Sequence, residues 1–374
     1  MTANLAIFTA QLGTVSETFI RKHVEGLLPG RTVVVARRCS APDDGRWKAS
    51  CPTLFLDRRA LALPVRLARR AGWSEDSLRA GAVERFLRRH HVGMVLGEYL
   101  DLFVDFVPLL DRLAIPYIAQ GHGIDVSAAL RRPGMSERYR AFKSAEAILT
   151  RCEFHRQRLI SLGLPAERIH VNPGGVDVPA AVPQRPPGAG KRFLAVGRMT
   201  RKKGPIYLLE AFRLAAQKEA QIALDYIGNG EMFSAAQQFV KAAGLRGRVR
   251  LHGAAPDEVK LRLFGECGTL VQHSLTDPDT GDEEGLPASI QEAMANGMAV
   301  VSTRHSGIAE AVQDGESGLL VDEGDAKGMA DAMLRIAMAD GLCERLGAAG
   351  RTRAAELYTW NAECARILSF LSHL

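Results

Sequence analysis

Short apolar runs alternate with segments of helical periodicity along the whole chain of 374 residues. The apolar runs, bounded by turn residues, predict buried strands, and the amphipathic stretches between them predict covering helices. This alternation is typical of α/β domains built on parallel sheets. The expected strands of the first half are 5–9, 32–36, 93–97, 116–119, 147–150 and 168–171, and those of the second half are 192–196, 222–228, 249–252, 269–272, 299–302 and 318–321.

A stretch rich in proline and glycine, without hydrophobic periodicity, separates the two halves between Val178 and Gly190. Such composition predicts an interdomain linker. We therefore expect an N-terminal domain over 1–178, a linker over 179–190 and a second domain over 191–357, followed by a C-terminal helix over 358–374. Open α/β sheets bind ligands at the carboxyl ends of their strands, so a cleft between the two domains is the expected binding site.

The net charge is +6, and the excess of arginine lies between Arg58 and Arg89. Arginine occurs there at positions 58, 59, 66, 69, 70, 79, 85, 88 and 89. A solvated helical face, an anionic membrane or lipid-linked substrate, and a nucleic acid are the three interpretations. Aromatic residues make up 6% of the chain, and none form a stacking platform among the arginines, which argues against a nucleic-acid partner.

The six cysteines are scattered and lack metal-ligand spacing, which indicates free thiols in a reducing compartment. No apolar run is long enough to span a bilayer. The N-terminal residues lack a basic region before an apolar one and are expected to form a strand and not a secretory signal. These features predict a cytoplasmic protein, with peripheral contact on the inner face of the membrane as the arginine-dependent alternative.

A helix flanked by two carboxylates is the most informative motif of the chain. Pro287 suits the first turn of a helix, and Gly297 suits the position just after its end. Glu292 lies within this predicted helix, and Glu284 lies on the loop before it. The helix N-terminus at 287–289 offers backbone N–H groups to a phosphate, and the carboxylates can accept hydrogen bonds from sugar hydroxyls. Either an ordinary buried helix or a nucleotide-sugar site fits this pattern.

A cationic loop follows the strand over 192–196. Gly197 and Arg198 begin it, and Lys203 and Gly204 end it. Arginine can grip a phosphate with two hydrogen bonds, and lysine supplies a point charge, although a basic surface loop has the same composition. Further along, Gly228-Asn-Gly230 fits either a tight turn or a loop that lines the cleft.

Taken together, these strings resemble the retaining glycosyltransferase family 4. The segment from Glu284 to Gly297 is similar to the Glu-x7-Glu region of the family, and Gly197–Gly204 is similar to its Gly-Arg-x4-Lys-Gly element. The resemblance implies that Arg198 and Lys203 hold the donor diphosphate. It also implies that Glu292 binds the ribose and that Glu284 holds the transferred sugar. The remaining donor contacts that it implies are Gly13, Gly197, Gly230, Gly285, Leu286 and Pro287.

The resemblance is weaker in the first half of the chain. Gly121-His122-Gly123-Ile-Asp125 resembles the His-Gly-x-Asp element of the family, which implies that His122 faces the donor sugar; Asp125 is expected to cap a helix. The string Ser16-Glu-Thr-Phe-Ile20 is similar to a subgroup that acts in colanic-acid-type exopolysaccharide synthesis. Ser16 and Glu17 also fit a helix N-cap and first turn. Departures from the family pattern are Ala299, Ser306 and Ala309, and Glu310 is expected to be structural.

The resemblance implies a GT-B fold, in which two Rossmann-like domains with parallel sheets face each other across a cleft and the C-terminal helix crosses back to the first domain. The implied activity is transfer of a sugar from a UDP- or GDP-sugar to a saccharide or lipid-linked saccharide, with retention and without cofactor or metal. Asp277-Pro-Asp279 matches the spelling of a metal-binding Asp-x-Asp pair, but Pro278 and Gly281 suggest a mobile loop. A nucleotide-sugar 2-epimerase and a non-catalytic nucleotide-sugar-binding protein are the alternatives.

Overall fold

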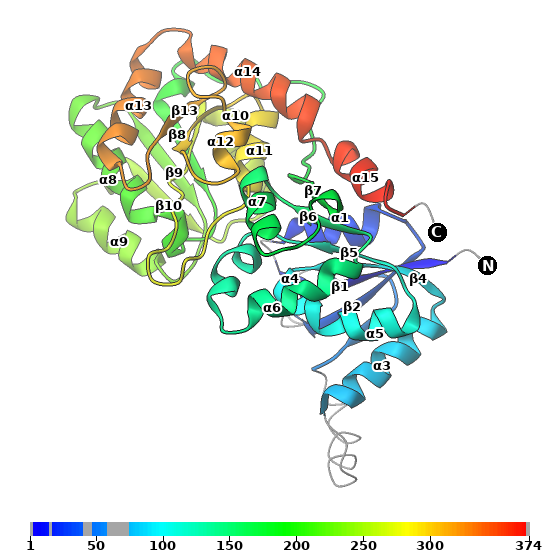
Figure 1. Cartoon of the computed structure of the whole chain (residues 1–374). Helices are drawn as coiled ribbons and strands as arrows, with labels where there is room; N and C mark the ends of the chain where they lie inside the picture. Colours follow the sequence, from blue (N-terminus) through cyan, green and yellow to red (C-terminus); the bar gives the residue numbers. More distant parts are fainter. Residues whose placement is uncertain (1–2, 15–16, 40–46, 58–74, 372–374) are drawn as a thin grey trace. The chain divides into compact units, whose positions relative to one another are not determined.

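The structure is a computed structural model, which describes residues 3–14, 17–39, 47–57 and 75–371 (Figure 1). The chain forms two compact units. Unit 1 comprises residues 1–151, 155–172 and 364–374, and unit 2 comprises residues 152–154 and 173–363. Ser16 and the arginines from Arg58 to Arg70 lie outside the described residues. Among the helices that the structure describes, none has the length and hydropathy needed to cross a bilayer.

Unit 1 contains a parallel sheet of seven strands in the order β3-β2-β1-β4-β5-β6-β7. Their bounds are β1 Asn4–Leu12, β2 Thr32–Cys39, β3 Thr53–Phe55, β4 Val92–Glu98, β5 Tyr117–Gln120, β6 Ala147–Thr150 and β7 Ile169–Val171. The helices of this region of the chain are α1 Thr18–Gly26, α3 Glu75–Arg89, α4 Leu100–Phe103, α5 Val107–Leu113, α6 Met135–Tyr139 and α7 Glu153–Ser161. The six strands expected for this half are confirmed, and β3 is an additional edge strand that the sequence analysis missed.

Unit 2 contains a parallel sheet of six strands in the order β10-β9-β8-β11-β12-β13. The strands are β8 Arg192–Val196, β9 Ala223–Ile227, β10 Val249–Gly253, β11 Thr269–Val271, β12 Ala299–Thr303 and β13 Leu319–Val321, all of which were expected. The helices are α8 Pro205–Lys218, α9 Phe233–Ala242, α10 Asp257–Glu266, α11 Ala288–Ala295, α12 Ile308–Ala311, α13 Ala326–Met338 and α14 Leu342–Leu357. Helix α15, Trp360–Leu368, begins in unit 2 and ends in unit 1.

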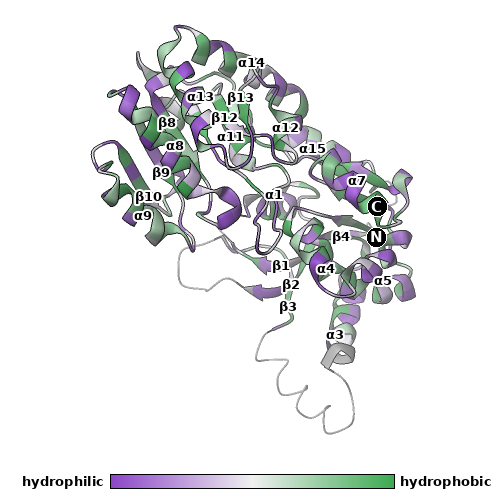
Figure 2. Ribbon diagram, turned by 60° about the vertical axis from the view of Figure 1, so that its left-hand side comes forward, coloured by the Kyte–Doolittle hydropathy of each residue, from purple (hydrophilic) through white to green (hydrophobic). Residues whose placement is uncertain are grey.

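Both faces of the unit 2 sheet are covered, which explains why its strands are apolar on successive residues and not only on alternate ones. On β8, Phe193 and Ala195 pack into one hydrophobic cluster, and Leu194 packs into the other. Figure 2 shows that helices such as α13 carry both apolar and polar positions along their length. Buried strands of this kind are the feature that the hydrophobic pattern predicts best.

The segment that was expected to be an interdomain linker, 179–190, lies within unit 2. Its Arg185 side chain donates hydrogen bonds to backbone carbonyls at the ends of two helices. The acceptors are Phe264 and Cys267 at the end of α10 and Asn296 and Gly297 at the end of α11. Helix C-termini leave such carbonyls without a partner inside the helix. Arg185 therefore fastens this segment to unit 2.

The order of the strands places a switch point in each sheet. In unit 1 the chain runs outward in opposite directions from β1 and β4, and in unit 2 it does so from β8 and β11. Loops that leave the carboxyl ends of such strand pairs diverge to either side and leave a crevice for a ligand. The loop after β8 and the segment after β11 contain the predicted cations and Glu284, so the fold of unit 2 brings these predicted residues to its switch point.

Candidate functional site

The candidate site of unit 2 is built on the neighbouring strands β8 and β11, which pair Phe193 with Thr269. The loop from Gly197 to Gly204 leaves β8, and the segment that ends at Glu284 leaves β11. The two meet at an ion pair, in which Lys203 Nζ lies 3.2 Å from Glu284 Oε2. These two residues are 81 positions apart in the sequence, and the pairing of β8 with β11 brings the segments that carry them together.

Glu284 is largely buried and has two cationic neighbours. Lys202 Nζ lies 3.4 Å from its Oε1 atom, in addition to Lys203 at Oε2. Burial by itself raises the pKa of this carboxyl, but the two lysines outweigh that effect and hold the pKa of Glu284 well below its usual range. The group is therefore a carboxylate at any pH at which the protein would work, and it can accept hydrogen bonds from hydroxyl groups.

The backbone of Glu284 is also held, by a histidine to which the sequence analysis gave no role. The Glu284 N–H donates to His305 Nε2 at 3.1 Å, and His305 Nδ1 lies 2.6 Å from Glu323 Oε1. Glu323 in turn accepts a hydrogen bond from the N–H of Thr276 at 2.8 Å. This chain of contacts orients Glu284 independently of the lysines, because it acts on the main chain and leaves the carboxylate to the site.

The two cations of the loop after β8 differ in their surroundings. Lys203 is largely buried, and this burial lowers its pKa from the ordinary value, although Glu284 acts in the opposite direction. Arg198 is exposed and has no ion-pair partner within the described residues. Its guanidinium is thus available to bind an anion. Lys203 can bind an anion only by giving up its ion pair with Glu284.

A glycine is required at position 230, where the segment after β9 packs closely against this loop. Gly230 has φ +154°, and a Cβ atom there would lie 2.6 Å from the carbonyl oxygen of Met199. The same turn pairs with the loop through backbone hydrogen bonds, from Met199 N–H to the carbonyl of Asn229 at 2.9 Å and from Met232 N–H to that of Met199 at 2.9 Å. The segment Gly228–Gly230 thus supports the cationic loop, and its place beside the donor stays a prediction.

The helix after Glu284 begins one residue later than expected. Pro287, with ψ 127°, is the N-cap of α11, and the helix begins at Ala288. The sequence pattern placed Pro287 in the first turn, but its extended ψ keeps it outside the helix. The N–H groups of Ala288 and Ser289 have no hydrogen-bond partner in the described residues, as expected for the first turn of a helix. Gly297 has φ +66° and follows the helix end, as predicted.

Glu292 lies in the middle of α11, with its side chain 26% exposed. Lys260 of α10 donates a hydrogen bond to its Oε1 atom at 3.1 Å. Sequence reasoning did not find Lys260, because α10 and α11 are joined through β11 and the long acidic segment. Glu292 thus keeps one carboxylate oxygen for a ligand.

The acidic segment before Glu284 is held by its own hydrogen bonds, contrary to the mobile loop that Pro278 and Gly281 suggested. The Asp277 carboxylate accepts from the N–H of Asp279 at 3.0 Å and from the hydroxyl of Thr280 at 2.8 Å. Asp279 forms an ion pair with Arg201. The two carboxylates of the Asp-x-Asp spelling therefore have separate partners, and within the described residues no three metal-ligating side chains converge on one point.

In unit 1, His122 belongs to a buried cluster at the carboxyl ends of β4 and β5. Its Nε2 atom lies 2.6 Å from Glu98 Oε2, and Glu98 Oε1 lies 2.6 Å from His23 Nδ1. Arg151 approaches the other nitrogen of His122, with Nε 3.2 Å from Nδ1. Arginine can only donate, so Nδ1 is the acceptor and Nε2–H donates to Glu98. The His122 ring is thus held from both sides, by Arg151 at Nδ1 and by Glu98 at Nε2.

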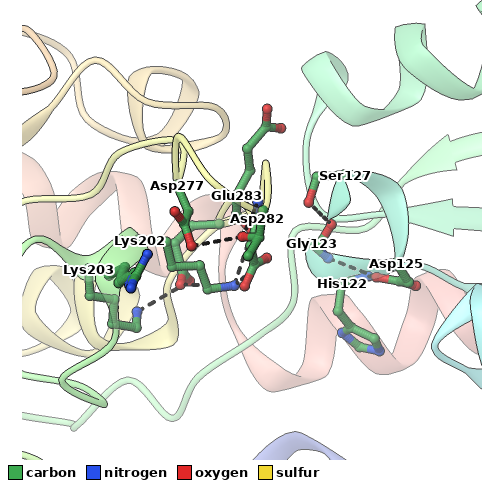
Figure 3. A network of polar contacts seen from close by, with 12 residues as sticks. His122, Gly123, Asp125, Ser127, Lys202, Lys203, Asp277, Asp282 and Glu283 are labelled. Carbon is green, nitrogen blue, oxygen red and sulfur yellow. Dashed lines mark hydrogen bonds and ion pairs between the residues drawn. The ribbon is translucent and has the colours of Figure 1, made fainter. Parts of the chain in front are cut away.

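Burial opposes the ionisation of Glu98, but the two histidines outweigh it and hold the pKa of Glu98 well below its usual range. Glu98, His23 and Arg151 were missed by sequence reasoning. The position of Glu98 as the last residue of an apolar strand was the one available signal. Asp125 is a cap, as predicted: its carboxylate accepts from the N–H of Leu100, the first residue of α4, and from His122 and Gly123 (Figure 3).

Gly13 follows β1 with φ +90°, a conformation that favours glycine. Glu17 is the N-cap of α1 and not a first-turn residue as expected, and its carboxylate accepts a hydrogen bond from Tyr99 Oη at 2.8 Å. The rings of Tyr99 and Phe19 each lie 4.5 Å from the His122 ring. Helix α1 and the residue after β4 therefore contribute to the surroundings of His122, through Phe19 and Tyr99.

Glu310 accepts hydrogen bonds from the N–H groups of Glu153 and Phe154 at the start of α7, at 2.9 and 3.1 Å. Two carboxylate oxygens on the first N–H groups of a helix form a structural cap. This arrangement gives Glu310 the structural role that the sequence predicted.

Two family models match the chain. The model described as Glycosyltransferase Family 4 matches residues 30–179, and the model described as Glycosyl transferases group 1 matches residues 182–353. The amylovoran biosynthesis glycosyltransferase AmsK of Erwinia amylovora is 34% identical over 226 residues, which cover 59% of this chain and 54% of AmsK. The putative colanic acid biosynthesis glycosyltransferase WcaL of Escherichia coli (strain K12) is 30% identical over 222 residues, with shares of 59% and 54%. The chain thus spans about half the length of the curated relatives it matches.

Two solved structures have the same fold. HepE of Anabaena, in complex with UDP and glucose, aligns with a TM-score of 0.78 at 17% identity and covers 99% of both chains. The lipopolysaccharide outer core galactosyltransferase WaaB aligns with a TM-score of 0.73 at 16% identity and covers 99% of this chain and 100% of its own.

Proposed function

The chain belongs to the glycosyltransferases of family 4 and has their GT-B fold, and from this we propose that it transfers a sugar from a nucleotide-sugar to a saccharide or lipid-linked saccharide, with retention of configuration. The observation that carries the proposal is the meeting of Lys203 and Glu284 at the switch point of unit 2, beside exposed Arg198 and the N-terminus of α11. Cations for a leaving diphosphate and a carboxylate for sugar hydroxyls are thereby assembled in one place.

Each group has a role in the proposed reaction. Arg198 and Lys203 neutralise the charge that develops on the diphosphate when the bond to the sugar breaks, and the N–H groups of Ala288 and Ser289 add to this stabilisation. Glu292 accepts hydrogen bonds from the ribose hydroxyls, and Glu284 holds the sugar that is transferred. The proton of the acceptor hydroxyl passes to the leaving phosphate. The roles of Gly13 and His122 of unit 1 as donor contacts stay predictions.

The relatives support a role in the synthesis of cell-surface or exported polysaccharide, since AmsK and WcaL are named for amylovoran and colanic acid biosynthesis. The nucleotide-sugar 2-epimerase that the sequence left open gains no support from them. HepE binds UDP, whereas a mannosyltransferase of Mycolicibacterium smegmatis, 24% identical over 304 residues, is GDP-mannose-dependent.

A thermal-shift screen of UDP- and GDP-sugars identifies the donor, because a ligand at a hundred times its Kd adds about 2.7 kcal/mol to the stability. Transfer of the sugar to an acceptor, with release of the nucleoside diphosphate, then tests the proposal; release of epimerised sugar alone contradicts it.

We expect transfer to continue in EDTA, and the product to keep the anomeric configuration of the donor. Arg198, Lys203 and the first turn of α11 already supply positive charge to the diphosphate, and Asp277 and Asp279 have other partners. The initial rate is measured with and without EDTA, and the product is examined by proton NMR. Asp279→Asn serves as a control that should retain the rate. Loss of activity in EDTA with recovery in magnesium or manganese would overturn this account of the leaving group.

We also propose reversible contact with anionic membranes through the arginine-rich segment 58–89, which the structure describes only from residue 75 onward. Among the arginines described there, Arg79 pairs with Asp57 and Arg88 pairs with Glu84, so the attraction rests on the others. We expect the protein to sediment with liposomes that contain phosphatidylserine at low salt and to be released as salt rises, because such attraction is screened. Absence of sedimentation at low salt would leave the segment as a solvated surface.

A further inference from the structure

Lys202, next to the predicted diphosphate ligand, is the most heavily engaged cation of the site. Its Nζ atom lies 3.0 Å from Asp282 Oδ1, 3.1 Å from the carbonyl oxygen of Glu283 and 3.4 Å from Glu284 Oε1 (Figure 3). Its own carbonyl accepts a hydrogen bond from the N–H of Leu275 at 2.8 Å. Side chain and main chain of Lys202 thus both bind the segment that carries Glu284.

We propose that Lys202 is a positioning residue that keeps Glu284 ionised and in place when the diphosphate of the donor draws Lys203 away from it. The inference rests on the proposed function, and it assigns a role to a lysine that the family motif leaves unspecified. Lys202 does not touch the diphosphate in this account; it acts through Glu284.

The argument begins from the charge of a buried carboxylate. Leaving such a group without a counter-ion is costly, and it then becomes protonated or moves. In the ligand-free protein Glu284 has two cations, at 3.2 and 3.4 Å. A diphosphate carries more negative charge than one carboxylate and competes for Lys203. After this exchange Lys202 alone remains beside Glu284, so the pair of lysines allows one to change partner without leaving the carboxylate unpaired.

The neighbouring contacts of Lys202 suit it to remain beside Glu284 when Lys203 changes partner. Asp282 and the carbonyl of Glu283 hold its ammonium group from the same segment, and its side chain is only 11% exposed. The adjacent carboxylates raise the pKa of Lys202 above its ordinary value in spite of burial. Lys203, by contrast, has an ion pair with Glu284 alone within the described residues. One lysine is anchored and the other is free to exchange.

Arg201 offers a matched control on the same turn. It carries the same charge one position earlier, but its side chain is 55% exposed and its partner is Asp279. Replacing Arg201 changes the net charge of the loop without changing the surroundings of Glu284. A comparison of Lys202→Met with Arg201→Met therefore separates the contact with Glu284 from the general loss of a positive charge.

The first measurement is kinetic. We expect Lys202→Met to raise KM for the donor about tenfold and to lower kcat by roughly ten- to a hundredfold, because Glu284 then retains Lys203 and is misplaced once Lys203 leaves. The acid limb of the kcat profile should move to higher pH, because Lys202 no longer lowers the pKa of Glu284. Lys202→Arg should restore most of both constants, and Arg201→Met should resemble the wild type. Equal effects of the two methionine variants, or a loss of kcat without a shift of the profile, would overturn the proposal.

The direction of the pH shift follows from the charges that face Glu284: Lys202 and Lys203 on its carboxylate, Asp282 and Arg198 nearby, and His305 at its main chain. The lysines lower the pKa of Glu284 in the folded protein, so its ionisation stabilises the fold above the pKa of the unfolded chain, and this contribution is lost as the pH falls through the folded pKa. Without Lys202 the folded pKa is higher, and the loss occurs at a higher pH.

The second measurement does not depend on sugar transfer. Thermal unfolding of the ligand-free protein is followed from pH 7 downward, and Lys202→Met should lose stability at higher pH than the wild type and Arg201→Met. Adding Glu284→Gln to Lys202→Met should remove the difference. If the pH dependence of stability does not change, the role of Lys202 is overturned, even where sugar transfer is observed. If the pH dependence shifts but no sugar transfer is found, the proposed function is contradicted and the role of Lys202 stands. Lys202→Gln is the second variant should the methionine not fold.

Discussion

Replacing Lys203 with alanine is expected to lower turnover by roughly a hundredfold or more, and Arg198→Ala should have an effect of the same size. In the proposed reaction both groups face charge that increases as the bond to the sugar breaks, so their contribution is larger in the transition state than in the ground state. Lys203 is the more informative of the two, because it is largely buried beside Glu284 and no water can readily take its place. The measurement is kcat and KM under saturating acceptor.

Arg246→Ala provides the control for these variants. Arg246 is exposed and has no ion-pair partner among the residues that the structure describes, so its removal lowers the net charge equally without touching the site. We expect it to keep the wild-type rate. Wild-type turnover in both Lys203→Ala and Arg198→Ala would remove the diphosphate from this loop, and an equal loss in Arg246→Ala would show that the effect belongs to net charge.

Replacing Glu284 with glutamine should lower the rate of catalysis and at the same time strengthen the binding of the nucleotide. We expect kcat to fall by roughly a hundredfold, because the amide cannot replace a carboxylate that holds the transferred sugar. Binding of UDP or GDP without a sugar should become tighter, since Lys203 no longer pairs with residue 284 and is available to the diphosphate. Calorimetric titration with the nucleoside diphosphate measures the second effect. Weaker binding of the nucleotide would contradict the exchange of partners at Lys203.

Glu292→Ala is the counterpart of this experiment. Ribose contacts change little between ground and transition states, so we expect KM for the donor to rise about tenfold with kcat nearly unchanged. Loss of the carboxylate also releases Lys260, its partner at 3.1 Å. Glu356→Gln, at an exposed position of α14, is the control for charge. If Glu292→Ala lowered kcat while Glu284→Gln raised only KM, the two roles would have to be exchanged.

The sequence by itself determined the α/β class and the strands, because buried parallel strands are apolar on both faces and are bounded by glycine and turn residues. All the strands that the pattern predicted are present. The strand that was missed, β3, has three half-buried residues at the edge of the sheet, and its apolar run of Leu54–Leu56 is shorter than the runs that predict a strand. The end of α11 before Gly297 was also predicted correctly, because a residue in the left-handed conformation after a helix is favoured as glycine by the local backbone alone.

The sequence also showed which residue types accompany the site, but the partners of those residues depend on strand order. Nothing local to Lys202 and Lys203 indicates that one is anchored by Asp282 and the other is not, because the acidic segment reaches them only through the pairing of β8 with β11. The same holds for Glu98, His23 and Arg151 around His122, which come from a strand, a helix and a loop that are far apart in the chain.

Local patterns misled where two physical causes compete. Proline and glycine suggested a mobile segment at 277–283, yet side-chain hydrogen bonds of Asp277 and the contact with Lys202 hold it. Pro287 suited the first turn of α11 and instead caps it, because a proline at either position lacks an N–H that the helix does not need. Composition and periodicity decide what is buried and where elements begin and end. Which charges meet at the site is decided by tertiary packing, because the order of the strands brings together segments that are far apart in the chain.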